Sequence, residues 1–524
     1  MQAHSPSFTV ISPGVPVLAS FLKALGAPVL LVALLVSCGG STNIADQDRV
    51  AGDASVLEIG YASGESAASV TKNLSLPTKG TFGGSTVAWA SSLPVVITPT
   101  GTVSRPPYGA DANVTLTATL TLGTGLTTKD FALKVKQVDT VQFLFTSDNH
   151  FGDVTSATAT TKFQGTTTTV DAVVVNIQAR NAMNTLPTQV APSDYGVNAG
   201  KAFGNFDFIV NTGDFASRSV PVPASNGNTS AQSFAQWESI YVDGLTLKDN
   251  NGSPLPHLLT PGNHDISNAL GGPEVMVPAY DPTAFVKIYN RMMNPAIPLT
   301  NASFDFNQHK VFYGKVFGGI HFVFLNQWLD AEMQENLAAY MATIPTTTPI
   351  VIFAHMPPEQ TGGNFRDPAS TGSDFPWSAG FANYFRDKMH ASNIISPATM
   401  ITTATVPTKE VTDLANFLKA RKNIVAWFNG HDNFNQFRTW NGENSVLITN
   451  TMTQLAIPVF RADSPMKGKD SAKDARLLSF QVISIDPAKK LMTVRECLWN
   501  KSNTLGGAIS WGVSETISLT NRVR

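Results

Sequence analysis

Five apolar runs in this 524-residue sequence end in side chains that can bind a metal ion or move a proton. The endings are Ser147-Asp148-Asn149-His150, Asn211-Thr212-Gly213-Asp214, Pro261-Gly262-Asn263-His264-Asp265, His355, and Asn429-Gly430-His431-Asp432-Asn433. Mixed imidazole and carboxylate groups suit Zn, Fe and Mn ions. Each motif alone has an ordinary interpretation as a turn or a core residue. Because the five motifs occur in this order and each follows an apolar run, we favour the interpretation that they form one shared metal site.

The segments that must position these residues alternate between strand-like and helix-like patterns from about residue 139 onward. This alternation predicts an α/β fold, in which ligands gather at the carboxyl ends of strands. Residues 171–186 and 329–344 are predicted helices, the second from its 3.6-residue apolar period. Residues 360–407 form a long irregular insertion, which we expect to be a lid or a rim of the site.

The ordered motifs resemble those of the calcineurin-like metallophosphoesterases, whose pattern is DxH, GD, GNHD or GNHE, a lone H, and GHxH. The resemblance covers about residues 139–500. It implies a two-sheet sandwich flanked by helices, and hydrolysis of phosphomonoesters or phosphodiesters by a dinuclear metal centre with a bridging hydroxide. Two divalent ions about 3.5–4 Å apart, with Mn, Zn and Fe as candidates, would be the cofactors. The expected substrate is a small molecule with a phosphate ester.

The resemblance also implies a role for each motif residue. The implied metal ligands are Asp148 and His150 for the first ion, Asn263, His355 and His431 for the second, and Asp214 as the bridge. His264 would stabilise or protonate the leaving oxygen, and Asp265 would hold that imidazole in the right tautomer and raise its pKa. Arg218 is a weaker candidate for contact with a substrate phosphate, and a surface arginine is the alternative.

Asn433 departs from the family pattern, which has histidine at this position of GHxH. Asn433 could ligate the first ion weakly, a water could take its place, or the first site could load poorly. We expect an active enzyme with weaker or altered metal preference there. The alternative is a non-catalytic envelope binding lipoprotein on a degenerate phosphatase scaffold.

The amino-terminal segment has the pattern of a bacterial export signal. Residues 24–36 are a thirteen-residue apolar run behind Lys23, too short for a spanning helix and typical of a signal-peptide core. Residues 35–38 (Leu-Val-Ser-Cys) resemble a lipobox, which implies a signal peptide over 1–37, lipid attached to Cys38, and a flexible tether over 38–49. The expected location is the cell envelope, lipid-anchored at the outer membrane or periplasmic face. An ordinary signal peptide is the alternative. Cys497 would then be a buried free thiol.

Residues 50–137 predict a small all-β domain. Val114, Leu116, Ala118 and Leu120 alternate with polar residues, as in a half-buried strand. Residues 50–137 resemble bacterial Ig-like domains, which implies an Ig-like sandwich. The resemblance rests on this alternation and on the segments Val87-Ala88-Trp89-Ala90-Ser91-Ser92 and Gly101-Thr102-Val103. The Ig-like domain would serve as a spacer or bind carbohydrate or the envelope, and the phosphoesterase domain would occupy 138–524.

Composition excludes several other classes. The net charge of −2 argues against a nucleic-acid binder that relies on a basic surface. Two cysteines rule out a disulfide scaffold and a cysteine-built zinc module.

Overall fold

The computed structural model describes most of the chain after residue 43. The described residues are 44–106, 111–152, 171–219, 227–250, 252–266, 281–305, 308–327, 331–358, 416–440, 445–447, 456–466, 478–500 and 508–520. The expected signal peptide, Cys38 and the 360–407 insertion lie outside them. The chain divides into two compact units, of which the smaller contains the first helix with residues 79–87 and 120–127.

The smaller unit is built around helix α1 (Ile44–Val56). Asp53 on this helix is buried, and its carboxylate accepts the backbone N–H groups of residues 82, 83 and 85 at 2.6, 2.6 and 2.8 Å. These bonds tie the helix to the 79–87 segment. The predicted tether over 38–49 is therefore wrong for residues 44–49, which are helical.

An antiparallel three-stranded sheet with a small core follows helix α1 in the chain. Strands β1 (Thr86–Ser91), β2 (Ala112–Leu122) and β3 (Gly125–Val135) lie in the order β1-β2-β3. Alternate residues of β2 are buried, as the two-residue period predicts. The core of this region contains Ile59, Val70, Leu74, Val96, Ile97, Val114, Leu116, Leu133 and Val135.

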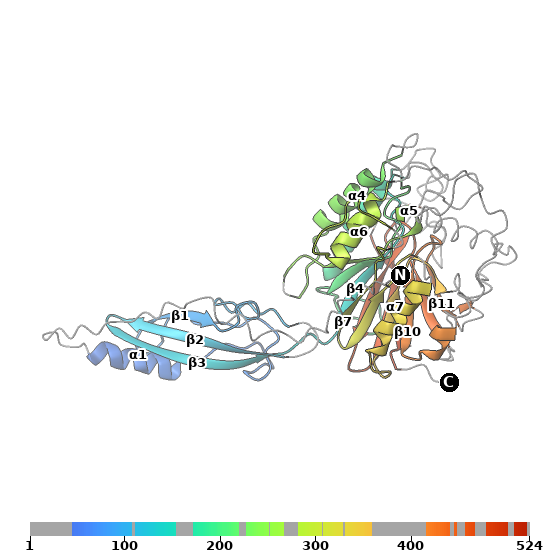
Figure 1. Cartoon of the computed structure of the whole chain (residues 1–524). Coiled ribbons are helices and arrows are strands. Elements are labelled where there is room, and N and C mark those ends of the chain that lie inside the picture. Colours follow the sequence, from blue (N-terminus) through green and yellow to red (C-terminus); the bar gives the residue numbers. More distant parts are fainter. Residues whose placement is uncertain are drawn as a thin grey trace, which may run out of the picture. The chain divides into compact units, whose positions relative to one another are not determined.

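Two further sheets form the α/β part of the chain (Figure 1). The six-stranded sheet has the order β16 (Ser510–Ser518), β15 (Leu491–Leu498), β14 (Ser479–Asp486), β4 (Val141–Thr146), β5 (Phe208–Asn211), β6 (His257–Leu259). The seven-stranded sheet has the order β12 (Ser445–Leu447), β11 (Gln436–Trp440), β13 (Ile457–Arg461), β10 (Ile424–Asn429), β9 (Ile350–Phe353), β8 (Ile320–Phe324), β7 (Tyr313–Phe317). Strands β4, β5 and β6 are parallel to one another, and so are β8, β9, β10 and β13. Each sheet therefore gathers several carboxyl ends at one edge.

Phenylalanines fill the space between the two sheets. Phe143 of β4 stacks on Phe208 of β5 with ring centroids 4.7 Å apart. It also meets Phe353 and Phe428 of the other sheet edge-on, at 5.9 and 6.0 Å. Because side chains alternate along a strand, Leu144 points to the opposite face, where it joins the helix-side core. This inner layer fixes the two sheets against each other.

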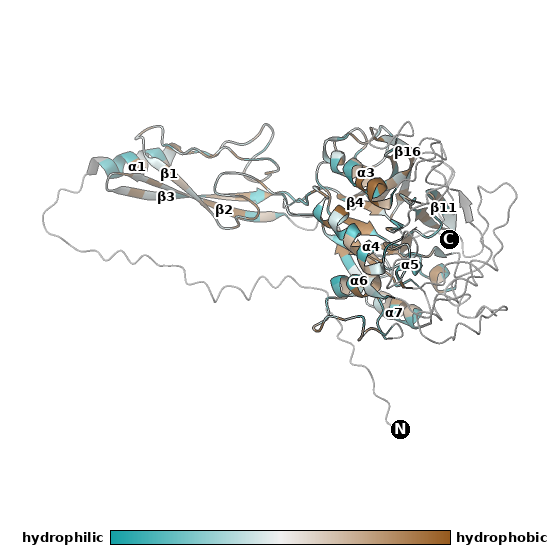
Figure 2. Ribbon diagram, turned by 90° about the horizontal axis from the view of Figure 1, so that it is seen from above, coloured by the Kyte–Doolittle hydropathy of each residue, from teal (hydrophilic) through white to brown (hydrophobic). Residues whose placement is uncertain are grey.

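Helices cover the outer faces of both sheets. Helices α3 (Ala172–Thr185), α4 (Ser230–Trp237) and α6 (Thr283–Met293) and the π-helix η2 (Glu238–Asp243) pack on the six-stranded sheet. Figure 2 shows apolar residues on α3 and β4. Helix α7 (Ala331–Ala342) packs on the seven-stranded sheet. The short elements η1 (Leu186–Thr188) and α5 (Asn263–Ile266) also belong to this part of the chain.

The observed elements confirm the predicted fold class, a two-sheet α/β sandwich flanked by helices and preceded by a small all-β region. The predicted helix over 171–186 is α3, and Asp171 caps it by accepting the Val173 N–H at 2.8 Å. Within the described chain, no helix is both long enough and apolar enough to cross a bilayer.

Candidate metal centre

The polar motifs all follow parallel strands. Residues 147–150 follow β4, residues 212–214 follow β5, and residues 260–265 follow β6. In the other sheet, residue 355 follows β9 and residues 430–433 follow β10. The structure brings these five loops together at one place.

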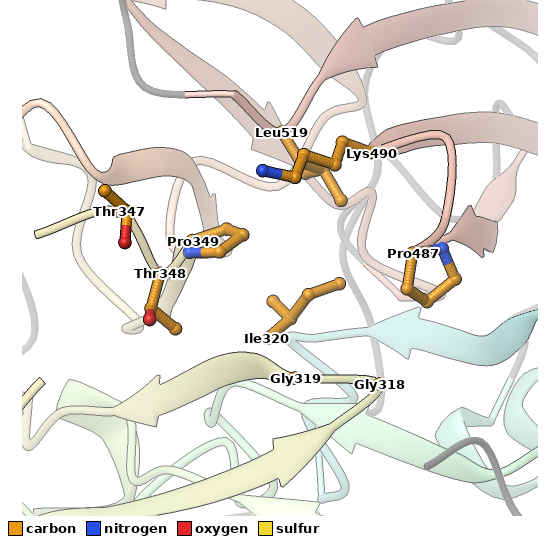
Figure 3. Close-up of a pocket in the computed structure, with 9 residues that line it drawn as sticks. All are labelled: Gly318, Gly319, Ile320, Thr347, Thr348, Pro349, Pro487, Lys490 and Leu519. Atoms are coloured by element: carbon orange, nitrogen blue, oxygen red, sulfur yellow. The ribbon is translucent and has the colours of Figure 1, made fainter. Parts of the chain in front are cut away.

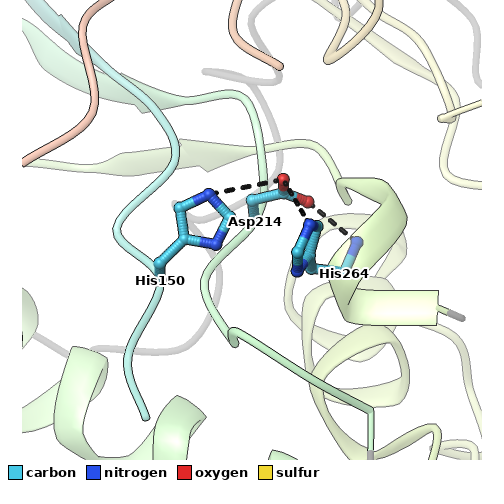
Figure 4. Close-up of side chains that lie close together, drawn as sticks. All are labelled: His150, Asp214 and His264. Atoms are coloured by element: carbon cyan, nitrogen blue, oxygen red, sulfur yellow. Dashed lines mark hydrogen bonds and ion pairs between the residues drawn. The ribbon is translucent and has the colours of Figure 1, made fainter. Parts of the chain in front are cut away.

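Asp214 is the centre of this cluster (Figure 4). Its Oδ2 lies 3.3 Å from His355 Nε2, 3.8 Å from His150 Nε2 and 3.9 Å from His264 Nε2. Two groups of metal-competent residues share it: His150, Asp214 and His264, and Asp148, Asp214 and His355. Within each group the ligand atoms lie within 4.8 Å of one another. One carboxylate thus faces both groups.

The surrounding charges keep Asp214 ionised. Burial alone would raise the pKa of this carboxyl, but the imidazoles of His355, His264 and His150 hold that pKa well below its usual range. The reverse effect acts on His355: burial lowers its pKa, but Asp214 and Asp148 raise it to about 9. The site therefore concentrates negative charge where cations would bind.

One side of the cluster is a convergence of three ligand atoms. Asn263 Oδ1 lies 3.1 Å from both His355 Nε2 and His431 Nδ1, and these two ring nitrogens are 3.2 Å apart. The other ring nitrogen of His355 faces the Thr212 carbonyl at 2.9 Å, which turns Nε2 toward the site. An imidazole N–H at this place can donate to only one neighbouring atom at a time. A cation would bind Asn263 Oδ1, His355 Nε2 and His431 Nδ1 together.

The other side contains His150, Asp148 and Asn433. His150 Nε2 lies 3.8 Å from Asp148 Oδ1 and 3.2 Å from Asn433 Oδ1. The Asn433 amide N–H₂ donates to the His431 carbonyl at 3.1 Å, so its oxygen faces His150. An amide oxygen thus occupies the place where the family pattern has an imidazole.

The site residues have strained backbone conformations. Asp148, His150, Asp214, His431 and Asn433 have φ values of 56°, 47°, 56°, 76° and 62°. Residues other than glycine rarely adopt positive φ, and such strain often marks functional sites.

Two glycines allow the loops to approach. Gly213 has φ 107°, and a Cβ there would lie 2.1 Å from the Gly262 nitrogen. A Cβ on Gly430 would lie 2.0 Å from Ser147 Oγ and 2.1 Å from Asp148 Oδ2. Any larger residue at either place would push neighbouring loops of the site apart.

Comparison with protein families identifies the two parts of the chain. A model of calcineurin-like phosphoesterases matches residues 141–432, and a model of the atrophied bacterial Ig domain matches residues 50–138. The chain belongs to the calcineurin-like phosphoesterase family. The resemblances to calcineurin-like metallophosphoesterases and to bacterial Ig-like domains are confirmed.

Other comparisons add little to this assignment. No curated protein matches the chain. A single-residue variant of Vps29 from Entamoeba histolytica is similar at 7% identity and a TM-score of 0.25, over 72% of this chain and 99% of that one.

The phosphoesterase site fits divalent cations by its donor set. It combines imidazole nitrogens, carboxylate oxygens and amide oxygens, all with short separations around an ionised, buried Asp214. His150 Nδ1 is buried and has no hydrogen-bond partner among the described residues. Together with the family, these features indicate divalent metal binding.

The predicted role of Asp265 is wrong. His264 Nδ1 lies 2.6 Å from the Ser217 carbonyl, which sets the orientation of the ring. The Asp265 carboxylate instead accepts the backbone N–H groups of Asp214, Gly262 and Ala216 at 2.8, 2.8 and 3.0 Å. Adjacent residues at a helix start point in different directions, so Asp265 fixes the backbone of the Asp214 loop and not the imidazole.

Arg218 and Cys497 complete the sequence-predicted residues. Arg218 is half-buried and directly follows Ser217, whose carbonyl faces the His264 ring. Its contact with a substrate phosphate stays a prediction. Cys497 is a buried free thiol in β15, as expected.

Sequence reasoning missed several residues that support the ligands. Asn149 lies between Asp148 and His150, and its side chain bonds with Asn176, Tyr241 and Asn211. Asn176 gave the clearest signal, because it is a polar residue in the apolar run Ala172-Val173-Val174-Val175-Asn176-Ile177 of α3. Tyr241 gave none, because only the fold brings η2 beside these loops.

A cavity of about 230 Å³ lies away from this site (Figure 3). Its lining includes Ile320 at the start of β8, Pro349 just before β9, and Lys490 between β14 and β15. Because the metal-competent residues follow the other ends of the parallel strands, the cavity belongs to the opposite edge of the sheet.

Proposed function

We propose that this protein is a phosphoesterase that hydrolyses phosphomonoesters or phosphodiesters of small molecules with two divalent cations, Mn, Zn or Fe. The observation that carries the proposal is the buried Asp214 carboxylate, which is shared by two groups of potential ligands. A single carboxylate in that position suits a bridge between two cations.

The proposed ligands are those that the family resemblance implies, and the close approach of their atoms supports them. Asp148, His150 and the Asn433 oxygen would hold one cation, Asn263, His355 and His431 the other, and Asp214 both. When bound, a pair of divalent cations supplies a nucleophile at neutral pH and neutralises charge on the phosphoryl group.

His264 would act on the leaving group. Donation from its Nδ1–H to the Ser217 carbonyl leaves Nε2 as the nitrogen that faces the Asp214 side of the site. A proton carried on Nε2 could be delivered to the departing oxygen. Asp265 contributes by fixing the backbone amides of the Asp214 loop.

We also propose a location at the bacterial envelope through lipid on Cys38. The residues that support this proposal are the apolar run 24–36 and the following Leu-Val-Ser-Cys. Labelling by a fatty-acid probe, present in the exported wild-type chain and lost in Cys38→Ala, would test it.

The activity is tested on the chain without residues 1–38, stripped of metal. Aryl phosphate monoesters and diesters are assayed after addition of Mn, Zn, Fe, Ni or Mg. Asp214→Asn is the test variant, and Asp139→Asn, whose side chain is 85% exposed, is the matched control. Metal-dependent turnover that is lost only in Asp214→Asn supports the proposal. Metal binding without turnover would refute it and favour the binding-protein alternative.

A further inference from the structure

A buried hydrogen-bond network lies behind the ligands expected for the first cation. Its members are Asn149 in the loop after β4, Asn176 on α3, Asn211 at the end of β5, and Tyr241 on η2. All four are buried. Polar groups in such a position must bond with one another, because water does not reach them.

Asn149 is the centre of this network. Its amide N–H₂ donates to Asn176 Oδ1 at 2.8 Å and to the Tyr241 hydroxyl at 3.3 Å. Its Oδ1 accepts from the Asn211 amide at 2.5 Å, and its backbone carbonyl accepts from the Asn176 amide at 3.1 Å. Asn176 therefore forms hydrogen bonds with both the side chain and the backbone of Asn149, which lies between Asp148 and His150.

The network also reaches the loop that contains Asp214. Asn211 Oδ1 accepts the backbone N–H of Gly213 at 2.9 Å. The two loops are bonded directly as well, since the N–H groups of Asp148 and His150 donate to the carbonyls of Gly213 and Asp214 at 2.9 Å. A shift of Asn149 would move ligands in both loops.

The helices fix the outer end of the network. Asn176 also donates to the Ala172 carbonyl at 2.9 Å, within its own helix. The Tyr241 hydroxyl donates to Asn176 Oδ1 at 2.9 Å. Tyr241 belongs to a π-helical turn, a rare geometry that is frequent at functional sites.

We propose that Asn176 and Tyr241 are positioning residues, which hold the strained loop of Asp148 and His150 in the geometry that binds the first cation. The inference rests on the proposed function. Asp148 and His150 have positive φ on both sides of Asn149, so the loop needs support from outside to keep this conformation. Asn176 supplies it through two bonds, and Tyr241 keeps Asn176 in place.

The test compares cation affinity with fold stability. Asn176→Leu and Tyr241→Phe are prepared in the full chain, together with Asn184→Leu. Asn184 is a matched control, because it lies on the same helix and fixes the 244–246 loop by two bonds, to the Gly244 carbonyl and the Thr246 N–H. Each variant is also made in a His431→Ala background, which isolates the first site. Mn²⁺ binding to metal-free protein is measured by calorimetry, and thermal unfolding is followed in chelator.

Asn176→Leu should weaken Mn²⁺ binding at the first site by about tenfold, the lower end of the effect of losing a direct partner of a ligand, because Asn176 acts through Asn149. Tyr241→Phe should have a smaller effect in the same direction, because Asn149 keeps its bond to Asn176. Asn184→Leu should lower the unfolding temperature and leave Mn²⁺ affinity unchanged.

The remaining outcomes separate this inference from the proposed function. Wild-type Mn²⁺ affinity in folded Asn176→Leu would overturn the positioning role, and so would an equal loss in Asn184→Leu. If the wild-type chain binds Mn²⁺ but hydrolyses no ester, the proposed function fails, and the affinities still decide the inference. A wild-type chain that binds none of Mn²⁺, Zn²⁺ and Fe²⁺ would overturn both.

Discussion

Asp207 offers a prediction whose size can be worked out from the structure. It lies just before β5, at the opposite end of that strand from Asp214. Its Oδ2 accepts the Gln142 N–H at 2.7 Å, and its Oδ1 accepts the Asn250 amide at 3.2 Å. Burial, with a smaller contribution from Asp249, raises the pKa of Asp207 to about 6. Ionisation of this carboxylate therefore destabilises the folded chain.

The sign and size follow from linkage. Because the folded pKa is raised above the usual 3.8, the favourable contribution is complete below pH 3.8 and is lost as pH rises through 6. A shift of about two pKa units corresponds to at most about 3 kcal/mol. Asp207→Asn should remove this loss of stability at higher pH. The new amide keeps the oxygen that accepts from the Gln142 N–H, and the Asn250 amide can turn to accept from the new N–H₂.

The assay is thermal or urea unfolding of metal-free protein between pH 4 and 8. Relative to wild type, Asp207→Asn should gain stability as pH rises, with a plateau above pH 7 at up to about 3 kcal/mol. Asp139→Asn controls for the loss of one negative charge. Phosphoesterase activity should not change, because Asp207 is remote from the ligands along β5. A stability difference that is constant over this pH range, or that falls with pH, would refute the reasoning.

Three further variants test other parts of the structure. Asp53→Ala leaves two buried N–H groups and one partly buried N–H group without an acceptor, and it should cost about 3 kcal/mol or more. This loss should be seen as early proteolysis near α1, whereas Asp48→Ala on the exposed side of α1 should be silent. Gly213→Ala should abolish activity and metal binding, because the alanine Cβ would clash with the Gly262 nitrogen. Gly204→Ala controls for backbone strain alone, because Gly204 has φ 67° and open space around it. Asn433→Ala should weaken Mn²⁺ binding at the first site roughly tenfold, and calorimetry that shows no change would exclude Asn433 as a ligand.

The sequence predicted the site well because of how α/β sheets are built. Apolar runs that end in polar motifs place those motifs at strand ends, and parallel strands bring the ends together. Asp148, Asp214 and His355 could therefore be grouped although they are far apart in the chain. The two outer helices α3 and α7 were also predicted, α7 from its 3.6-residue apolar period.

The misses share a different physical cause. The helix α1 is stabilised by bonds from Asp53 to residues 82–85, which lie far away in sequence. The Asp265 side chain was assigned to its neighbour His264, but its direction depends on the local backbone, which sends it to the amides of the Asp214 loop. Tyr241 acts through tertiary contacts of a π-helical turn. Neither composition nor spacing contains this information.

Asn433 shows how a departure from the family pattern can be interpreted through the backbone. Its φ of 62° is left-handed, a conformation that asparagine tolerates well. That tolerance does not explain the absence of histidine, because His431 in the same loop has φ 76°. An imidazole could also keep both contacts, with Nδ1–H toward the His431 carbonyl and Nε2 toward His150. Under the proposed function, the two residues differ in their ligand chemistry. A neutral amide oxygen needs no deprotonation and binds Zn²⁺ less well than an imidazole, so Asn433→His should raise Zn²⁺ affinity at the first site more than Mn²⁺ affinity. Equal gains for the two ions in calorimetry would show that the replacement changes packing and not ligand type.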